Sequence, residues 1–451
     1  GTNTYSGTTT ISAGTLSVSA DANLGTAPGS PTAASITLDG GTLAASGSFT
    51  LNTNRGVTLG ASHGTVDVAT GATLTYGGVI AGASKNLTKT GSGTLLLSGV
   101  NTYTGTTTIS AGTLQQGAAG VLSDSTAVTV TSGATWNLGG YSETVASIAG
   151  GSTATISLGT GSLSNTLTVG GSNASTTYAG DISGSGGKLT KTGTGVLTLT
   201  GDTTFTGTLT ISGGTVQLGS GGTTGSVATM TIVNNGTLDV NRSTLLTYAG
   251  DISGTGGVTI SGSGGLSLTG TNTFSGAVTV ASGNLTLDRD SCGADADKTI
   301  AFGNIVNNST ITFALDEAGV TCTYPAVMSG TGGIVKTGVS TLVFTGSNTY
   351  SGTTVVNGGT LRIGGSTGER IADTSAVSVG SGATFDVNGR TERVGSIAGA
   401  GNVVLGAGTL TSGDSSDTSF SGVISGAGDL VKVGSGTLTL SGTNTFTGSS
   451  T

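Results

Sequence analysis

Charged residues, proline, cysteine and histidine are all scarce in this chain. Of its 451 residues 8% are charged, three are Pro, two are Cys and one is His. His63 has no second histidine and no ordered carboxylate near it in the sequence, which argues against catalytic triads and ordinary histidine metal sites. A polysaccharide lyase or hydrolase could work with carboxylates and one basic residue, but the charges here are scattered singly. We therefore expect no enzyme.

Basic residues and long apolar runs are also lacking. Lys and Arg number 14 against 22 Asp and Glu, so the net charge is -8 and nothing basic is available to neutralise a phosphate backbone. We expect no nucleic-acid partner. No run approaches the ~18 apolar residues of a membrane-spanning helix, and the alternating segments are too rich in Gly and too closely spaced for membrane barrel strands. The chain is expected to be soluble or exposed on a surface.

Glycine is abundant, with 86 residues, yet the apolar residues are ordered. From Tyr76 through Leu87, Lys89, Leu95 and on to Ile109, apolar and Gly positions recur at every second residue, with one slip. That alternation is the period of a β-strand. Gly, Ser and Thr stand where a helix needs Ala, Leu, Glu or Lys, so the sequence predicts essentially no α-helix.

One phrase recurs along the chain. It reads "GTNTYSGTTTISAGTL" from Gly1 and returns from Val100, Asp202, Thr271 and Ser347, with a last copy, "GTNTFTGSST", from Gly442. A second aromatic precedes the aromatic of the phrase at a nearly fixed distance, at Tyr76, Tyr178, Tyr248, Tyr324 and Phe420. The segments between the blocks also contain a repeated sequence, which begins at Ser125 and again at Thr374. The chain begins and ends within copies of the same phrase. We therefore expect it to be a piece of a longer polypeptide.

Short strands, no crossover helices and long-range repetition leave an antiparallel meander or a parallel β-solenoid. Regular Asn-Gly hairpin turns, which a meander would show, are missing, so the solenoid is favoured. We expect one continuous all-β rod over residues 1–451, with coils of ~20 to 25 residues, about 18 to 22 in number. The expected interior column comprises Leu95, Leu97, Ile109, Leu114, Leu197, Leu199, Ile211, Leu438 and Leu440.

The recurring block resembles a known family. "GSGTLLLSGVNTYTGTTTISAGTLQ" from Gly91 and "GSGTLTLSGTNTFTG" from Gly434 are similar to the passenger-associated transport repeat of bacterial autotransporters. The resemblance implies a right-handed parallel β-helix, exported across the outer membrane and displayed outside the bacterial cell. It implies a role in adhesion, self-association or biofilm formation, and membrane attachment only through a C-terminal barrel that this segment lacks.

An irregular region is expected at about residues 288–325. Asp288, Asp290, Asp295 and Asp297 cluster there in a chain otherwise poor in charge, and could hold Ca²⁺, although their spacing fits no known calcium loop and a solvated loop explains them as well. Cys292 and Cys322 are the only cysteines, and an exported chain allows a disulfide between them. Unlinked thiols are the alternative. No other cofactor is expected.

Three repeated features could serve binding instead of structure. Lys89, Lys191, Lys336 and Lys432 recur at a nearly fixed distance after the first aromatic of a block, and we interpret them as outward, solubilising charges more readily than as a glycan site. The aromatic pairs are interpreted as core or corner packing and not as a sugar platform. Thr-rich runs recur only at long intervals, so we do not expect them to fill consecutive coils as an ice-binding face would require.

The function expected from these observations is attachment outside the cell. The chain would be part of an autotransporter adhesin that binds copies of itself on neighbouring cells, or a host or abiotic surface, with a glycan as a further partner. Many weak side-by-side contacts would supply the avidity. The alternative is a passive stalk or filament that holds a distal domain away from the cell.

Overall fold

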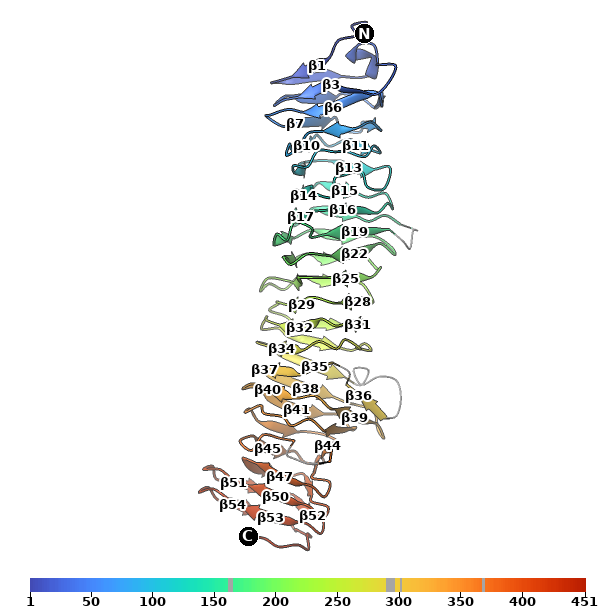
Figure 1. Cartoon of the computed structure of the whole chain (residues 1–451). Coiled ribbons are helices and arrows are strands. Elements are labelled where there is room, and N and C mark those ends of the chain that lie inside the picture. The colour runs from blue at the N-terminus through green and yellow to red at the C-terminus, as the bar shows by residue number, and fades with distance from the viewer. Residues whose placement is uncertain (161–164, 289–296, 301, 367–369) are drawn as a thin grey trace. The chain divides into compact units, whose positions relative to one another are not determined.

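The computed structural model describes residues 1–451 except 161–164, 289–296, 301 and 367–369. It is a parallel β-solenoid of about 19 turns with 1% helix, which confirms the expected fold class. The chain divides into two compact units: unit 1 comprises Gly1–Ser220 with Thr224–Gly236, and unit 2 comprises Gly221–Thr223 with Thr237–Thr451. Within each unit successive strands stack coil upon coil (Figure 1). A single continuous β-helix over 1–451 stays a prediction.

Unit 1 contains a 3-10 helix, η1 (Asp21–Leu24), and strands in several parallel stacks. In stacking order the strands are β1 (Thr9–Ile11), β3 (Thr32–Leu38), β6 (Arg55–Leu59) and β9 (Ile80–Ala81); β2 (Thr15–Val18), β4 (Thr42–Ala45), β7 (Gly64–Val68), β10 (Leu87–Thr90), β12 (Thr107–Ile109), β14 (Ala127–Val130), β17 (Ser147–Gly150), β20 (Thr176–Tyr178), β23 (Val196–Leu199) and β26 (Thr215–Leu218); β5 (Phe49–Leu51), β8 (Thr73–Tyr76), β11 (Thr94–Leu97), β13 (Thr113–Gln116), β15 (Thr135–Asn137), β18 (Thr155–Ser157) and β21 (Asp181–Ser183); β16 (Glu143–Val145), β19 (Thr166–Val169), β22 (Lys188–Lys191), β25 (Leu209–Ile211) and β28 (Thr231–Asn234); and β24 (Asp202–Thr203) with β27 (Ser226–Val227).

Unit 2 is built in the same way. Its strands in stacking order are β29 (Thr237–Val240), β32 (Gly257–Ile260), β34 (Val278–Val280), β37 (Ile305–Asn307) and β40 (Met328–Ser329); β30 (Leu246–Tyr248), β33 (Leu266–Leu268), β35 (Asn284–Asp288), β38 (Thr310–Ala314), β41 (Gly333–Thr337), β43 (Thr354–Val356), β45 (Ala376–Val379), β48 (Ser396–Gly399), β51 (Thr418–Phe420) and β54 (Leu438–Leu440); β36 (Asp297–Thr299), β39 (Thr321–Tyr324), β42 (Thr341–Phe344), β44 (Thr360–Ile363), β46 (Thr384–Asp386), β49 (Asn402–Val404) and β52 (Val423–Ser425); β47 (Thr391–Val394), β50 (Thr409–Ser412) and β53 (Asp429–Lys432); and β31 (Asp251–Ser253).

The core is made of side-chain columns that run through successive coils. Because parallel strands pair in register, equivalent residues lie one above the other. One column in unit 1 consists of Leu74, Leu95, Leu114, Trp136, Ile156 and Ile182. Each of these side chains is at most 2% exposed. The strand alternation in the sequence therefore reports correctly which face of each strand is buried.

The predicted interior column is confirmed at seven of its nine positions. Leu438 is half-buried and Leu440 is 38% exposed. Both lie in β54, which pairs only with β51 and so has a neighbour on one side. The missing neighbour, not the residue pattern, explains their exposure.

Corner glycines allow the coils to approach each other closely. A Cβ atom on Gly99 would lie 2.1 Å from the carbonyl oxygen of Gly78 in the preceding coil. At Gly112 the backbone takes a φ of 62°, and a Cβ would lie 2.4 Å from the carbonyl oxygen of Gly93. Any larger residue at these corners would push consecutive coils apart.

Threonine fills the same outward position in consecutive coils of unit 1. In register these residues are Thr15, Thr42, Thr65, Thr88, Thr108 and Thr129. It is single threonines, and not the Thr-rich runs, that fill consecutive coils here, because coils of unequal length still align the same outward position. The next position on the same side of these strands is mixed, with Ser17, Ala44, Asp67 and Thr90, so no flat double row of threonines results.

Candidate functional site

The recurring lysines point into the coil and not outward. The side chains of Lys89, Lys191 and Lys336 are at most 1% exposed, and Lys432 is half-buried. In unit 2, Lys336 stacks in register between Phe313 and Val356. The interpretation of these residues as solubilising surface charges is wrong. Each lysine stands two residues after a buried residue of its strand, so the strand alternation assigned it to the interior.

Each buried ammonium group lies within a cage of backbone carbonyls at a corner of the repeat. Lys89 Nζ donates to the carbonyls of Thr90 at 2.6 Å and Gly91 at 2.7 Å, and to that of Ala111 in the next coil at 3.2 Å. Lys191 and Lys336 repeat this arrangement, with two carbonyls directly after the lysine and a third from the next coil. The lysine thus bonds to backbone carbonyls of two coils at once.

Desolvation sets the ionisation of these lysines. Burial lowers the pKa of Lys89 to about 8, against a smaller opposing effect of Asp67. It lowers the pKa of Lys336 to about 8 in the same way, opposed by Asp316, and it lowers the pKa of Lys191 as well. In a fourth copy of the repeat Ile260 occupies this position, stacked between Val240 and Val280. The cage is therefore a feature of the lysine copies, and an aliphatic residue can fill its place.

The asparagine of the recurring phrase joins neighbouring coils from inside. Asn101 Oδ1 accepts a hydrogen bond from the backbone N–H of Ile80 at 2.8 Å, and its Nδ2 donates to the carbonyl of Val121 at 2.9 Å. Asn348 does the same between Met328 and Arg370, both at 2.7 Å. The Asn-Thr-aromatic phrase was visible in the sequence, but this role was not anticipated.

Replacing Asn101 with alanine is expected to destabilise unit 1 by about 2 kcal/mol, because the buried backbone N–H of Ile80 loses its acceptor. The carbonyl of Val121 keeps a hydrogen bond from the backbone N–H of residue 101 at 3.0 Å. The check is the urea midpoint of the 451-residue chain with and without the change. The matched control is Thr102→Ala, because Thr102 follows Asn101 directly and its side chain is exposed. This change should leave the midpoint near that of the unaltered chain. An N101A variant as stable as T102A would contradict the bridging role.

The aromatic residues of the repeat lie in the core, as predicted. Tyr103, Phe205, Phe274 and Tyr350 are fully buried, and the preceding aromatics are at most 5% exposed. The hydroxyls of Tyr103 and Tyr350 each lie 2.6 Å from a threonine hydroxyl four residues on. Tyr5, in the first copy, is 43% exposed.

Among the described residues, each unit has one buried glutamate. Glu143 Oε2 accepts from the backbone N–H groups of Val121 at 2.9 Å and Leu122 at 3.2 Å, and from the side-chain amide of Gln116. Glu392 accepts from the N–H groups of Arg370 and Ile371. It stands at the equivalent position of the similar segment that begins at Thr374. Both glutamates were overlooked in the sequence, where the shared "SIAG" that follows each one was the available signal.

Burial raises the pKa of Glu143 to about 7, although four hydrogen-bond donors oppose the shift. An unfolded glutamate titrates near 4.3, so the folded chain binds more protons than the unfolded chain between about pH 4.3 and 7. Stability that this group contributes at low pH is therefore expected to be lost as the pH rises through that window. The check is the urea midpoint from pH 4.5 to 7.5; Glu143→Gln should flatten the dependence for unit 1, and an unchanged slope would contradict it.

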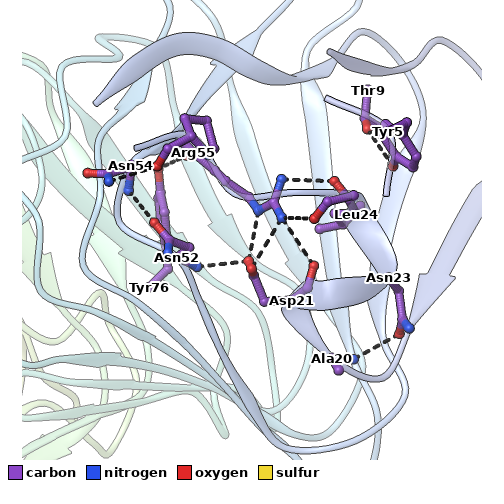
Figure 2. Close-up of polar contacts among 12 residues, drawn as sticks. Tyr5, Thr9, Ala20, Asp21, Asn23, Leu24, Asn52, Asn54, Arg55 and Tyr76 are labelled. Carbon is purple, nitrogen blue, oxygen red and sulfur yellow. Dashed lines mark hydrogen bonds and ion pairs between the residues drawn. The ribbon is translucent and has the colours of Figure 1, made fainter. Parts of the chain in front are cut away.

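At the beginning of unit 1 an internal ion pair fixes η1 to the coils (Figure 2). Arg55, 3% exposed, donates from Nε to Asp21 Oδ1 at 2.8 Å and from Nη1 to the carbonyl of Leu24 at 2.8 Å. Its Nη2 reaches the carbonyl of Gly25 at 2.6 Å, and Tyr76 donates to the carbonyl of Arg55 itself at 2.6 Å. Because the guanidinium of Arg55 is bonded to Asp21 and to backbone carbonyls, Arg55 is a structural residue.

The predicted calcium and disulfide residues lie mostly outside the described part of the chain. Asp290, Asp295 and Cys292 are not described, and for Asp297 only the backbone in β36 is. Asp288 ends β35, and Cys322 in β39 is buried. Calcium binding and the Cys292–Cys322 pairing stay predictions. Among described residues, no three His, Cys, Asp or Glu side chains are grouped so that they could hold a metal ion.

Two open cavities lie on the outside of the coils. One, of about 280 Å³ in unit 1, is lined by Pro31, Ala34 and Val79 beside a register shift between β3 and β6. The other, of about 440 Å³ in unit 2, lies between residues 347–349 and 371–374. His63 is near neither; its Nδ1 accepts from the backbone N–H of Asn86 at 3.1 Å. No helix in the described residues is long and apolar enough to cross a membrane.

Comparison with known proteins agrees with these features. The family model described as passenger-associated-transport-repeat matches residues 1–18, 87–115, 189–218, 258–287, 334–363 and 430–451. The caged lysines, the bridging asparagines and the second aromatic of each block lie within these segments. The first aromatic of each block lies 10 or 11 residues before the matched segment. No solved structure matches the chain.

A curated relative is similar over the full length of the chain. It is the "Adhesin BmaC autotransporter" of Brucella suis biovar 1 (strain 1330), 36% identical over 463 residues. The alignment covers 100% of this chain and 12% of the relative, so the chain spans about an eighth of the length of that protein. The repeats, the solenoid and this similarity together show that the chain belongs to the autotransporter passengers that carry passenger-associated transport repeats.

Proposed function

We propose that this chain is a surface-displayed, non-enzymatic segment of an adhesin that attaches cells to one another or to a surface, in part by contact with a second copy of itself. The relative named an adhesin supports the attachment role and an extracellular location at the bacterial surface. Membrane attachment would be supplied by parts of the longer protein.

The observation that carries the self-association part is the uncharged threonine row of unit 1. The row presents a hydroxyl at the same position of six consecutive coils, from Thr15 to Thr129. Hydroxyls both donate and accept, so two such rows can pair with each other. A chain with net charge -8 repels its own copies elsewhere, so an uncharged row is the surface on which two copies can meet. Repeated weak contacts would add up through avidity.

Bead clustering tests this function. One set of beads carries the purified chain, a second colour is left bare, and mixed and like-coloured aggregates are counted across salt concentrations. Coated beads are expected to cluster with one another and to exclude bare beads, with little loss at high salt because the contacts are uncharged. Dispersed beads at every salt concentration would contradict self-association and favour the passive stalk.

A further inference from the structure

The groove of unit 2 is formed by the corners of two successive coils. One wall is the segment 347–349, between β42 and β43, and the other is the segment 371–374, between β44 and β45. Its volume of about 440 Å³ lies within the range of roughly 300–1,000 Å³ that is usual for small-molecule sites.

Buried polar groups hold both walls in place. Asn348, 5% exposed, donates from Nδ2 to the carbonyl of Arg370 and so ties one wall to the other. Beneath them, Glu392 is fully buried and accepts from the N–H groups of Arg370 and Ile371, at 2.9 and 2.6 Å. Arg370 Nη1 also donates to Ser347 Oγ at 3.1 Å. A groove fixed in this way loses little conformational freedom when a ligand binds.

The lining offers the chemistry that recognises a sugar. Ser347, Thr349 and Thr374 bring hydroxyls, each of which can donate and accept. The Asp373 carboxylate is 48% exposed, and its Oδ2 lies 3.6 Å from Arg393 Nε. That distance is longer than a hydrogen bond, so the carboxylate oxygens can accept from a ligand. Ala372 adds a small apolar surface between the polar groups.

We propose that this groove binds one pyranose unit of a glycan, with the Asp373 carboxylate accepting hydrogen bonds from two adjacent sugar hydroxyls and Thr349 and Thr374 pairing with others. Charge-assisted bonds to the carboxylate supply the orientation, and the hydroxyls supply the remaining partners. The inference rests on the attachment part of the proposed function and names the ligand class; it does not depend on self-association.

Unit 1 carries a degenerate copy of the same place. Asp124 corresponds to Asp373 in the two filler sequences "VLSDSTAV" and "RIADTSAV". Thr102 and Ser125 keep hydroxyls at the places of Thr349 and Thr374, but Val100, 64% exposed, and Val121 replace Ser347 and Arg370. The hydrogen bond that holds the Ser347 wall in unit 2 therefore has no counterpart between these two residues, and one wall is apolar, so the unit 1 position is not expected to bind sugar. Asp124 is therefore a matched control.

The test is saturation-transfer NMR on the 451-residue chain with methyl α-glucopyranoside, methyl α-galactopyranoside and methyl α-mannopyranoside as probes. At least one is expected to bind, with a Kd of about 1 mM, as suits a single open subsite. Asp373→Asn should weaken that binding at least about tenfold, which is about 1.4 kcal/mol, whereas Asp124→Asn should leave it unchanged. Circular dichroism checks that both variants are folded.

Two results would overturn the proposal. One is the absence of binding by all three probes to the unaltered chain; the other is equal binding by D373N and D124N. The bead experiment separates this from the proposed function. If the beads cluster while no sugar binds, self-association is supported and the sugar site is ruled out. If a sugar binds while the beads stay dispersed, the sugar site is supported and self-association is ruled out.

Discussion

Replacing Trp136 with alanine is expected to lower the free energy of unfolding of unit 1 by about 3–5 kcal/mol. Trp136 is fully buried and stacks in register between Leu114 and Ile156. Its removal leaves a cavity in the middle of a column, where the coils above and below are held by their own strand pairing and cannot collapse into the space. Urea unfolding followed by far-UV circular dichroism measures the loss.

The chain itself supplies the control for this change. Phe385 occupies the corresponding place of unit 2, in "GATFDV" against "GATWNL", and it is fully buried as well. The indole N–H of Trp136 has no hydrogen-bond partner among the described residues, so Trp136→Phe removes an unsatisfied donor along with some packing. We expect W136F to cost at most about 1.5 kcal/mol. A W136A variant no less stable than W136F would show that the column does not carry the stability assigned to it.

The buried lysines give the second large effect, a rise in stability between about pH 8 and pH 10. The pKa of Lys89 and of Lys336 is about 8 in the folded chain, against about 10.4 for a lysine in an unfolded chain. Over that interval the unfolded chain binds more protons, so stability increases with pH. Each unit of pKa difference corresponds to about 1.4 kcal/mol. Below pH 8 both states are protonated and this contribution is absent.

Buried tyrosines oppose the trend at higher pH. Burial raises the pKa of Tyr76 to about 12, and raises the pKa of Tyr103 and Tyr350 still further. Unfolded tyrosines ionise near pH 10, so the folded state loses stability above that pH. The two effects together place the maximum of stability near pH 10.

The measurement is the urea midpoint of the chain at pH 7.5, 9, 10 and 11. In a Lys89→Met, Lys191→Met, Lys336→Met variant the rise from pH 8 to 10 should be lost, while the fall above pH 10 remains. Lys85→Met, a change at a partly exposed lysine outside the cages, serves as the control. If the triple variant kept the same rise, the lysines would not be the groups that titrate.

The fold could be predicted from the sequence because its determinants are local and repeated. Strand alternation from Tyr76 to Ile109 and the fixed spacing of the aromatics indicated stacked coils with the aromatics inside, and the structure confirms both. The inward lysines were missed because a charge in a polar sequence was assumed to face water. The position of Lys89 two residues after Leu87 placed it on the buried face, and only the carbonyl cage, which needs three-dimensional information, shows how that burial is stabilised.

The candidate binding site was beyond prediction for a different reason. Ser347 and Asp373 lie in different coils, and coil lengths in this chain are irregular, so the sequence did not show that they face one groove. The same irregularity concealed the threonine row, because the stretch of chain between Thr15 and its partner Thr42 is longer than the stretch between Thr88 and its partner Thr108. Register, which decides what lies beside what, is set by how much chain each corner accommodates.

The lysine cages also allow the closing of individual coils to be followed by chemical labelling. An amine that is buried and bound to three carbonyls cannot be acylated, whereas the same amine in an open coil reacts freely. Acylation of Lys89, Lys191 and Lys336 therefore follows three separate places along the chain. Each lysine stops reacting once its own coil has closed on the next. Brief exposure to an acylating reagent during refolding, followed by peptide mass mapping, would give the order in which the coils close.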